Sequence, residues 1–225
     1  MPEPRPFDRL GPPSWPAPWG VLALLLLTGL ALIRNGSGEF DSHPPQPAPA
    51  AATGALSPAD ASGATTAQAS PTGLSASPAL RVRVPGAGVD APVRPVGLDR
   101  EGWIDPPPAR APHPAGWFTG SPAPGESGTS VLVGHVDGAD GPAVFHGLGA
   151  LEKGGRVEVA RADGRAAVFT VYGVDVVPKD GFPARRVYAG TGRPELRLIT
   201  CGGRYRQGEG YDANVVVFAR LSAVR

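Results

Sequence analysis

The stretch ELRLITCGG, residues 195–203, decides how the C-terminal part of the chain is expected to fold. Its apolar residues have the period of two of a β-strand, which gives the strand two distinct faces. One face holds Arg197, Ile199 and Cys201, and the other holds Leu196, Leu198 and Thr200. Two glycines follow Cys201, so we expect the strand to end there and the thiol to project into a cleft.

A second stretch, ANVVVFARL at residues 213–221, is apolar on both faces and predicts a central strand. Asn214, Val216, Phe218 and Arg220 share one face, with Val215, Val217 and Ala219 opposite. Five further Val-rich stretches separated by Gly and Pro predict strands at residues 81–84, 91–96, 129–133, 156–161 and 166–177. Seven or so strands spaced by turns, with short helices at most near residues 143–151 and 183–188, predict an all-β barrel or sandwich.

Composition limits the folded part of the chain and its partners. The 21 Lys and Arg nearly balance the 20 Asp and Glu, which argues against a nucleic-acid partner. The 32 glycines and 28 prolines among 225 residues indicate much turn, loop and linker. We therefore assign one compact domain to residues 81–225, a normal size for a single core.

The N-terminal 80 residues predict export. Residues 19–33 form an uncharged apolar run that follows Arg5 and Arg9, so we expect a cytoplasmic segment at 1–18 and a single-pass transmembrane signal-anchor at 19–33. A cleaved signal peptide is the alternative, and both place the following domain outside the cell. Residues 34–80, rich in Ala, Ser, Pro, Thr and Gly, predict a disordered linker.

The chain has a single cysteine, Cys201, which cannot form an internal disulfide in an oxidising compartment. It is therefore a reactive thiol, a small buried apolar residue or an intermolecular link. A thiol nucleophile needs a base or cation nearby, usually an imidazole. Of the four histidines, His135 is the best candidate because it follows the apolar strand of SVLVGHVDG, whereas His43 lies in the linker, His113 lies between prolines and His146 fits a short helix.

The order VLVGHVDG, LRLITCGG and YDANVVVFA, together with an N-terminal anchor and spacer, resembles the sortases, and in particular the class E and F enzymes of high-GC actinobacteria. The resemblance implies a single eight-stranded β-barrel and a cysteine transpeptidase at the cell surface. Its substrates would be secreted proteins with a C-terminal LPxTG-like sorting signal. The acceptor would be a peptidoglycan-precursor amine.

The resemblance also implies roles for individual residues. Cys201 would attack the threonine carbonyl, and His135 would protonate the leaving amine and later accept a proton from the incoming one. Sortases carry an arginine before the last apolar run, where this chain has Asn214. We rank Asn214 first as the oxyanion or substrate donor, ahead of Arg204 and then Arg206.

Other readings of the motifs stay open. Asp137, two residues after His135, either orients the imidazole in a Cys-His-Asp triad or forms a turn. We expect no metal site and no cofactor. If transfer fails, the chain is a sortase-fold hydrolase, and if Cys201 is merely buried, it is a surface-tethered β-domain that binds a wall or protein ligand.

Overall fold

The computed structural model describes residues 20, 24–28, 44–53, 72–108, 110 and 113–225. It divides into two units, residues 1–42 and 43–225. In the first unit residues 24–28 are helical. Most of the predicted membrane span, 19–33, lies outside the described residues, and no helix in the described part is long and apolar enough to cross a membrane.

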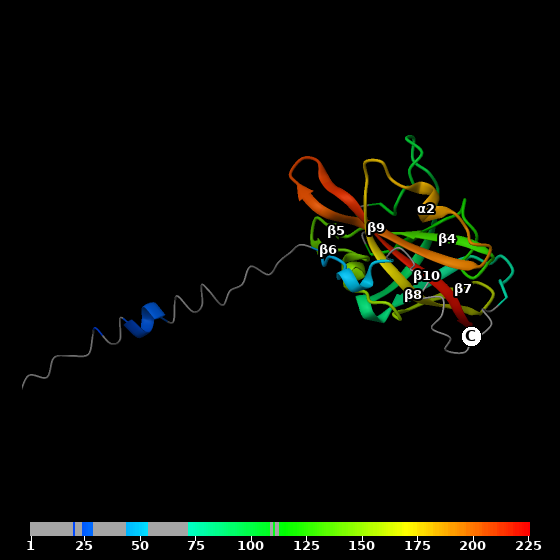
Figure 1. Cartoon of the computed structure of the whole chain (residues 1–225), viewed down its shortest axis with the longest axis horizontal. Helices are drawn as coiled ribbons and strands as arrows, with labels where there is room; N and C mark the ends of the chain where they lie inside the picture. The colour runs from blue at the N-terminus through cyan, green and yellow to red at the C-terminus, as the bar shows by residue number, and fades with distance from the viewer. Residues whose placement is uncertain (1–19, 21–23, 29–43, 54–71, 109, 111–112) are drawn as a thin grey trace, which may run out of the picture. The chain divides into compact units, whose positions relative to one another are not determined.

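The second unit is built on a closed eight-stranded barrel with the strand order β1-β2-β3-β4-β9-β10-β8-β7 (Figure 1). Two pairs, β2–β3 and β4–β9, are parallel, and the other pairs are antiparallel. The barrel strands are β1 (Ala79–Val84), β2 (Val89–Val96), β3 (Ala115–Phe118), β4 (Gly128–Val133), β7 (Arg156–Arg161), β8 (Ala166–Pro178), β9 (Pro194–Arg206) and β10 (Gly210–Val224).

Helices and short strands fill the connections. In the described part of this unit, the 3₁₀ helices are η1 (Pro49–Ala51), η3 (Pro85–Ala87) and η4 (His146–Ala150), and the α-helix is α2 (Ala184–Tyr188). After β4, the two short strands β5 (Asp137–Gly138) and β6 (Gly141–Pro142) form a small hairpin. The seven predicted strands and both predicted short helices are confirmed. The sequence missed β3, because its four residues are flanked by glycine and proline.

The alternation of residues along β9 and β10 is confirmed by two separate apolar clusters. Inside the barrel, the side chains of Leu196 and Leu198 pack with those of Val215 and Val217. On the outer face, Ile199 packs with Val131, Val133, Val216 and Phe218, and the cluster is covered by Val187 of α2. Because both faces of β9 are buried, its pairing register is fixed from two sides.

The predicted end of the Cys201 strand is wrong. β9 continues through Gly202 and Gly203 to Arg206, and with β10 it forms an arm that extends past the barrel (Figure 1). The ladder shifts between Tyr211 and Ala213, which indicates a β-bulge in β9 where Gly203 and Arg204 oppose Asp212. Gly203 has φ 81°, a left-handed conformation that favours glycine.

Part of the predicted linker is ordered, so the prediction of disorder for residues 34–80 does not hold for 44–53 and 72–80. Thr53 donates from its N–H and its hydroxyl to the Asp175 carboxylate, at 2.7 and 2.5 Å. Arg186 of α2 pairs with the same carboxylate. Ala51 is 3% exposed and belongs to the interior cluster. A proline-rich segment with few large apolar residues is thus held by a partner that its own sequence does not reveal.

The packing of residues 44–53 predicts a large effect of Gly149→Ala. A Cβ at Gly149 would lie 1.7 Å from the Pro45 carbonyl oxygen, so the segment would have to move. We expect a loss of about 1–3 kcal/mol in the free energy of unfolding and faster amide exchange over 44–53. Gly97→Ala is the matched control, because a Cβ there has no neighbour within 4 Å. Equal stability and exchange in the two variants would contradict the docking of this segment.

Candidate active site

Two predicted site residues lie side by side on adjacent strands, and a third follows the end of the strand on the other flank of β9. On one flank of β9, Val133 of β4 pairs with Ile199 in parallel, and the N–H of Gly134 donates to the Ile199 carbonyl at 3.1 Å. Beyond this pair, His135 follows the end of β4 while β9 continues to Cys201. On the other flank, Asn214 of β10 pairs directly with Cys201. Directly opposed residues share a face, with Cβ atoms about 5 Å apart.

A cavity of about 340 Å³ lies over Cys201 and Asn214, and its wall includes Gly134, the residue before His135. Its floor comes from β9 and β10, and its walls come from the end of β4, the segment before β3 and the segment after β8. The lining residues are Trp103, Ile104, Pro106, Val133, Gly134, Lys179, Tyr188, Ile199, Thr200, Cys201 and Asn214. Cys201 and Asn214 are both half-buried, so the thiol and the amide are accessible from the cavity.

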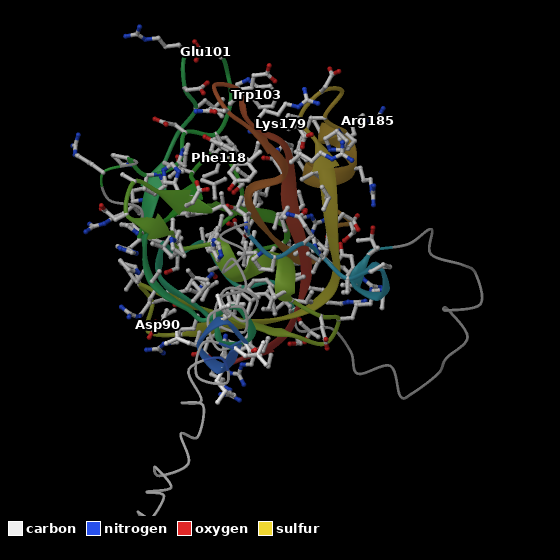
Figure 2. The ribbon with its side chains drawn as sticks, turned by 90° about the vertical axis from the view of Figure 1, so that its left-hand side faces the viewer. Asp90, Glu101, Trp103, Phe118, Lys179 and Arg185 are labelled. Carbon is white, nitrogen blue, oxygen red and sulfur yellow. The ribbon has the colours of Figure 1, made fainter. Side chains whose placement is uncertain are left out.

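A second cavity of about 800 Å³ adjoins the first and shares Trp103, Ile104, Lys179 and Tyr188 with it. Its wall is rich in aromatic side chains. The Phe182 ring lies 6.4 Å from Trp103 and 5.7 Å from Tyr188, centroid to centroid. Trp103, Phe118 and Lys179 lie at one end of the molecule, with Asp90 at the other (Figure 2). The two cavities together offer an extended apolar groove that ends at Cys201.

The imidazole of His135 is held by a backbone carbonyl. Its Nε2 lies 2.6 Å from the Pro107 oxygen, and because a carbonyl can only accept, Nε2 carries the hydrogen. Nδ1 is therefore the nitrogen that remains for proton exchange. In the described part of the chain no hydrogen bond joins His135 to Cys201.

The triad interpretation of Asp137 is not supported by its contacts. The Asp137 carboxylate accepts the hydroxyl hydrogen of Tyr211 at 2.5 Å. This bond ties the hairpin after His135 to the β9–β10 arm. Burial, followed by the hydrogen bond to Asp137, raises the pKa of the Tyr211 phenol far above its usual value, so Tyr211 stays a neutral donor.

The two arginines ranked behind Asn214 lie on the exposed arm and line neither cavity. The Arg204 N–H donates to the Asp212 carboxylate at 2.8 Å, and the Arg206 side chain pairs with Glu209 at 3.5 Å. Arg197 is 2% exposed and is bound to Glu195 at 2.6 Å and to the Val187 carbonyl at 2.9 Å. It therefore holds α2 against β9.

Comparison with models of protein families matches residues 82–222 to the sortase domain. The match spans more than half of the chain and contains His135, Cys201 and Asn214. The chain belongs to the sortase family. A search of curated proteins found no match.

Solved sortase structures share the fold at low sequence identity. The SrtA sortase from Actinomyces oris aligns with a TM-score of 0.52 and 21% identity over 71% of this chain and 89% of its own. A lid mutant of sortase A from Corynebacterium diphtheriae aligns with a TM-score of 0.51 and 18% identity over 65% and 72%. Another structure of that sortase A aligns at 17% identity with a TM-score of 0.49. This alignment covers 65% of the present chain and 62% of the sortase A chain.

Sortases are cysteine transpeptidases, and the barrel expected from the resemblance is confirmed. Sequence reasoning missed four residues of this sortase's groove: Trp103, Ile104, Lys179 and Tyr188. Two of them, Lys179 and Tyr188, lie between β8 and β9. Burial raises the pKa of the Tyr188 phenol. The described residues contain no group of three or more side chains suited to holding a metal ion.

The bond between Tyr211 and Asp137 predicts the effect of Tyr211→Phe. Losing it should lower the free energy of unfolding by about 1 kcal/mol at pH 7 and speed amide exchange in residues 135–142. The raised pKa of Tyr211 gives stability that is complete below pH 10, the usual tyrosine range, and is lost as pH rises above it. The deficit of the variant should thus be constant between pH 6 and pH 9, roughly, and should shrink above about pH 10.

Denaturant melts across this range would measure the deficit, with Tyr205→Phe as the control. The Tyr205 ring packs edge-on against Tyr211 with a centroid distance of 5.2 Å, but its hydroxyl makes no hydrogen bond in the described part of the structure. A deficit as large in Tyr205→Phe as in Tyr211→Phe would show that ring packing, not the bond to Asp137, accounts for the loss.

Proposed function

We propose that this sortase is a membrane-anchored transpeptidase that cleaves an LPxTG-like sorting signal and joins the protein to a cell-wall amine. The observation that carries the proposal is the pairing of Cys201 with Asn214 under one cavity, with His135 just after the end of β4, the other neighbour of β9. A thiol, an imidazole and an amide donor in register are the groups that acyl transfer through a thioester requires.

In the first step the Cys201 thiolate attacks the threonine carbonyl, forming the C–S bond while the carbonyl electrons move to oxygen. The tetrahedral intermediate then collapses, the C–N bond breaks, and the leaving glycine amine takes a proton from His135. In the second step the wall-precursor amine attacks the thioester, gives a proton to His135 and expels the thiolate. The Pro107 carbonyl keeps hydrogen on Nε2, so Nδ1 is the nitrogen that gains and loses the proton.

Asn214 is the donor that we assign to the oxyanion, because its side chain lies on the same face as the thiol and directly opposite it. The groove of the two joined cavities would hold the apolar residues of the sorting signal. Residues 19–33 would anchor the chain in the membrane with the barrel outside the cell. We keep the class E or F assignment as part of this proposal, since it rests on the sequence motifs.

Cys201→Ala should abolish cleavage, and His135→Ala should lower it by at least about 10². The test incubates the full chain with a fluorogenic LPxTG-like peptide, with and without a glycine-based amine. Mass spectrometry would follow the acyl-enzyme, and His146→Ala serves as the control because His146 bonds the Val136 carbonyl outside the cavity, at 3.1 Å. A cysteine that resists alkylation in the folded protein, with no peptide cleaved, would contradict the proposal. Cleavage without amine incorporation would indicate a hydrolase.

Asn214→Ala should lower turnover by about 10² with little change in KM, because one oxyanion donor is lost. Arg204→Ala should leave turnover within about twofold, since a charge on the exposed arm is largely screened. Steady-state kinetics on the same peptide would measure both variants. Normal turnover in Asn214→Ala together with a collapse in Arg204→Ala would move the donor role to the arm.

A further inference from the structure

The groove contains one cation. Among the described residues that line the two cavities, Lys179 is the only charged one, and it lines both. The chain has only one other lysine, Lys153, which is exposed and lines neither cavity. Lys179 is therefore the one charged side chain among these lining residues that can stabilise an anion in the groove.

Strand pairing brings Lys179 towards the thiol. Asn214 pairs with Val177 of β8, and the ladder continues as the Lys179 N–H donates to the Asp212 carbonyl at 3.0 Å. Lys179 is thus the diagonal neighbour of Asn214, at a distance of about 7–8 Å between backbones that long side chains can bridge. Cys201 lies on the other side of Asn214. The order across the sheet is His135, Cys201, Asn214 and then the strand end that carries Lys179.

The ammonium group is available for a substrate. In the described part of the chain Lys179 forms no ion pair. The nearest acidic residue across the ladder, Asp212, uses its carboxylate to accept the Arg204 N–H at 2.8 Å. Lys179 itself is exposed, so it keeps its hydration while the groove is empty.

We propose that Lys179 is a catalytic residue that stabilises the oxyanion formed when Cys201 attacks the substrate carbonyl, acting from the strand next to Asn214. This rests on the proposed transpeptidase function. A peptide lying in the groove excludes water around Lys179, and the charge–charge interaction is strongest when water is excluded. Asn214 supplies a neutral hydrogen bond to the oxyanion, and Lys179 supplies the positive charge.

Lys179→Met tests the proposal, because methionine keeps much of the apolar stem and removes the charge. The peptide carries no charged residue, so that Lys179 cannot act by attracting a substrate side chain. We expect kcat to fall about 10- to 100-fold with KM within about threefold. Lys153→Met is the matched control and should equal the wild type. Lys179→Arg, which keeps the charge, should stay within about fivefold of the wild type.

A charge returned on the neighbouring strand should restore activity. In the Lys179→Met background, Asn214→Arg should raise kcat at least about tenfold, because a guanidinium opposite Cys201 replaces the lost cation. Higher ionic strength should slow the wild type more than Lys179→Met, since screening acts on the charge. A purely structural role of Lys179 predicts neither result.

Three outcomes would overturn the proposal. The first is a kcat for Lys179→Met within twofold of the wild type. The second is a loss of activity in Lys179→Met that affects only KM. The third is that Lys179→Arg loses activity and the Lys179→Met, Asn214→Arg double variant does not regain it. Acyl-enzyme formation by the wild type separates this failure from that of the proposed function. If the wild type forms the acyl-enzyme and Lys179→Met turns over normally, only the role of Lys179 is lost.

Discussion

The site depends on the register in which β9 pairs with β4 on one flank and β10 on the other. A shift of β9 by one residue would turn Cys201 into the barrel and bring Leu198 and its neighbours to the outer face. Both faces of β9 are buried, by the interior cluster and by the cluster under α2, so such a shift would expose apolar side chains on either side. The alignment of His135, Cys201 and Asn214 is therefore as stable as the core itself.

Gly202 and Gly203 let β9 stay paired with β10 beyond Cys201, whereas a loop at this point would end the pairing. A Cβ at Gly202 would lie 2.6 Å from Val215 Cγ2, and one at Gly203 would lie 2.4 Å from the Asp212 carboxylate. Close approach at these positions lets β9 carry an extra residue, with Gly203 and Arg204 opposite Asp212, and continue alongside β10. The resulting arm places Tyr211 against Asp137, so the segment after His135 is held from the same strand that carries Asn214.

The sequence predicted seven strands and the faces of β9 and β10, because their long valine-rich alternation leaves one buried arrangement. It missed β3, whose Ala115–Phe118 is too short for a pattern and pairs in parallel with the distant β2. It misjudged residues 44–53, where Asp175 and a close approach to Gly149 supply order that composition conceals. The order of motifs placed His135, Cys201 and Asn214 together, but nothing local to Cys201 pointed to Lys179.

Closeness in sequence to Cys201 favoured Arg204 and Arg206 as candidate cations. Strand pairing, however, determines which side chains lie near the thiol. Arg204 follows Cys201 by three residues, yet the bulge and the arm carry it away, whereas Lys179 comes back to the site through β8. A guanidinium at position 214 would stand on a central, half-buried strand with no carboxylate lining the cavity to offset its desolvation. A lysine at the rim avoids this cost in the empty enzyme, since its charge stays in water until substrate covers it. On this proposal, the barrel keeps a neutral side chain opposite Cys201 and still presents a charge to the reacting carbonyl.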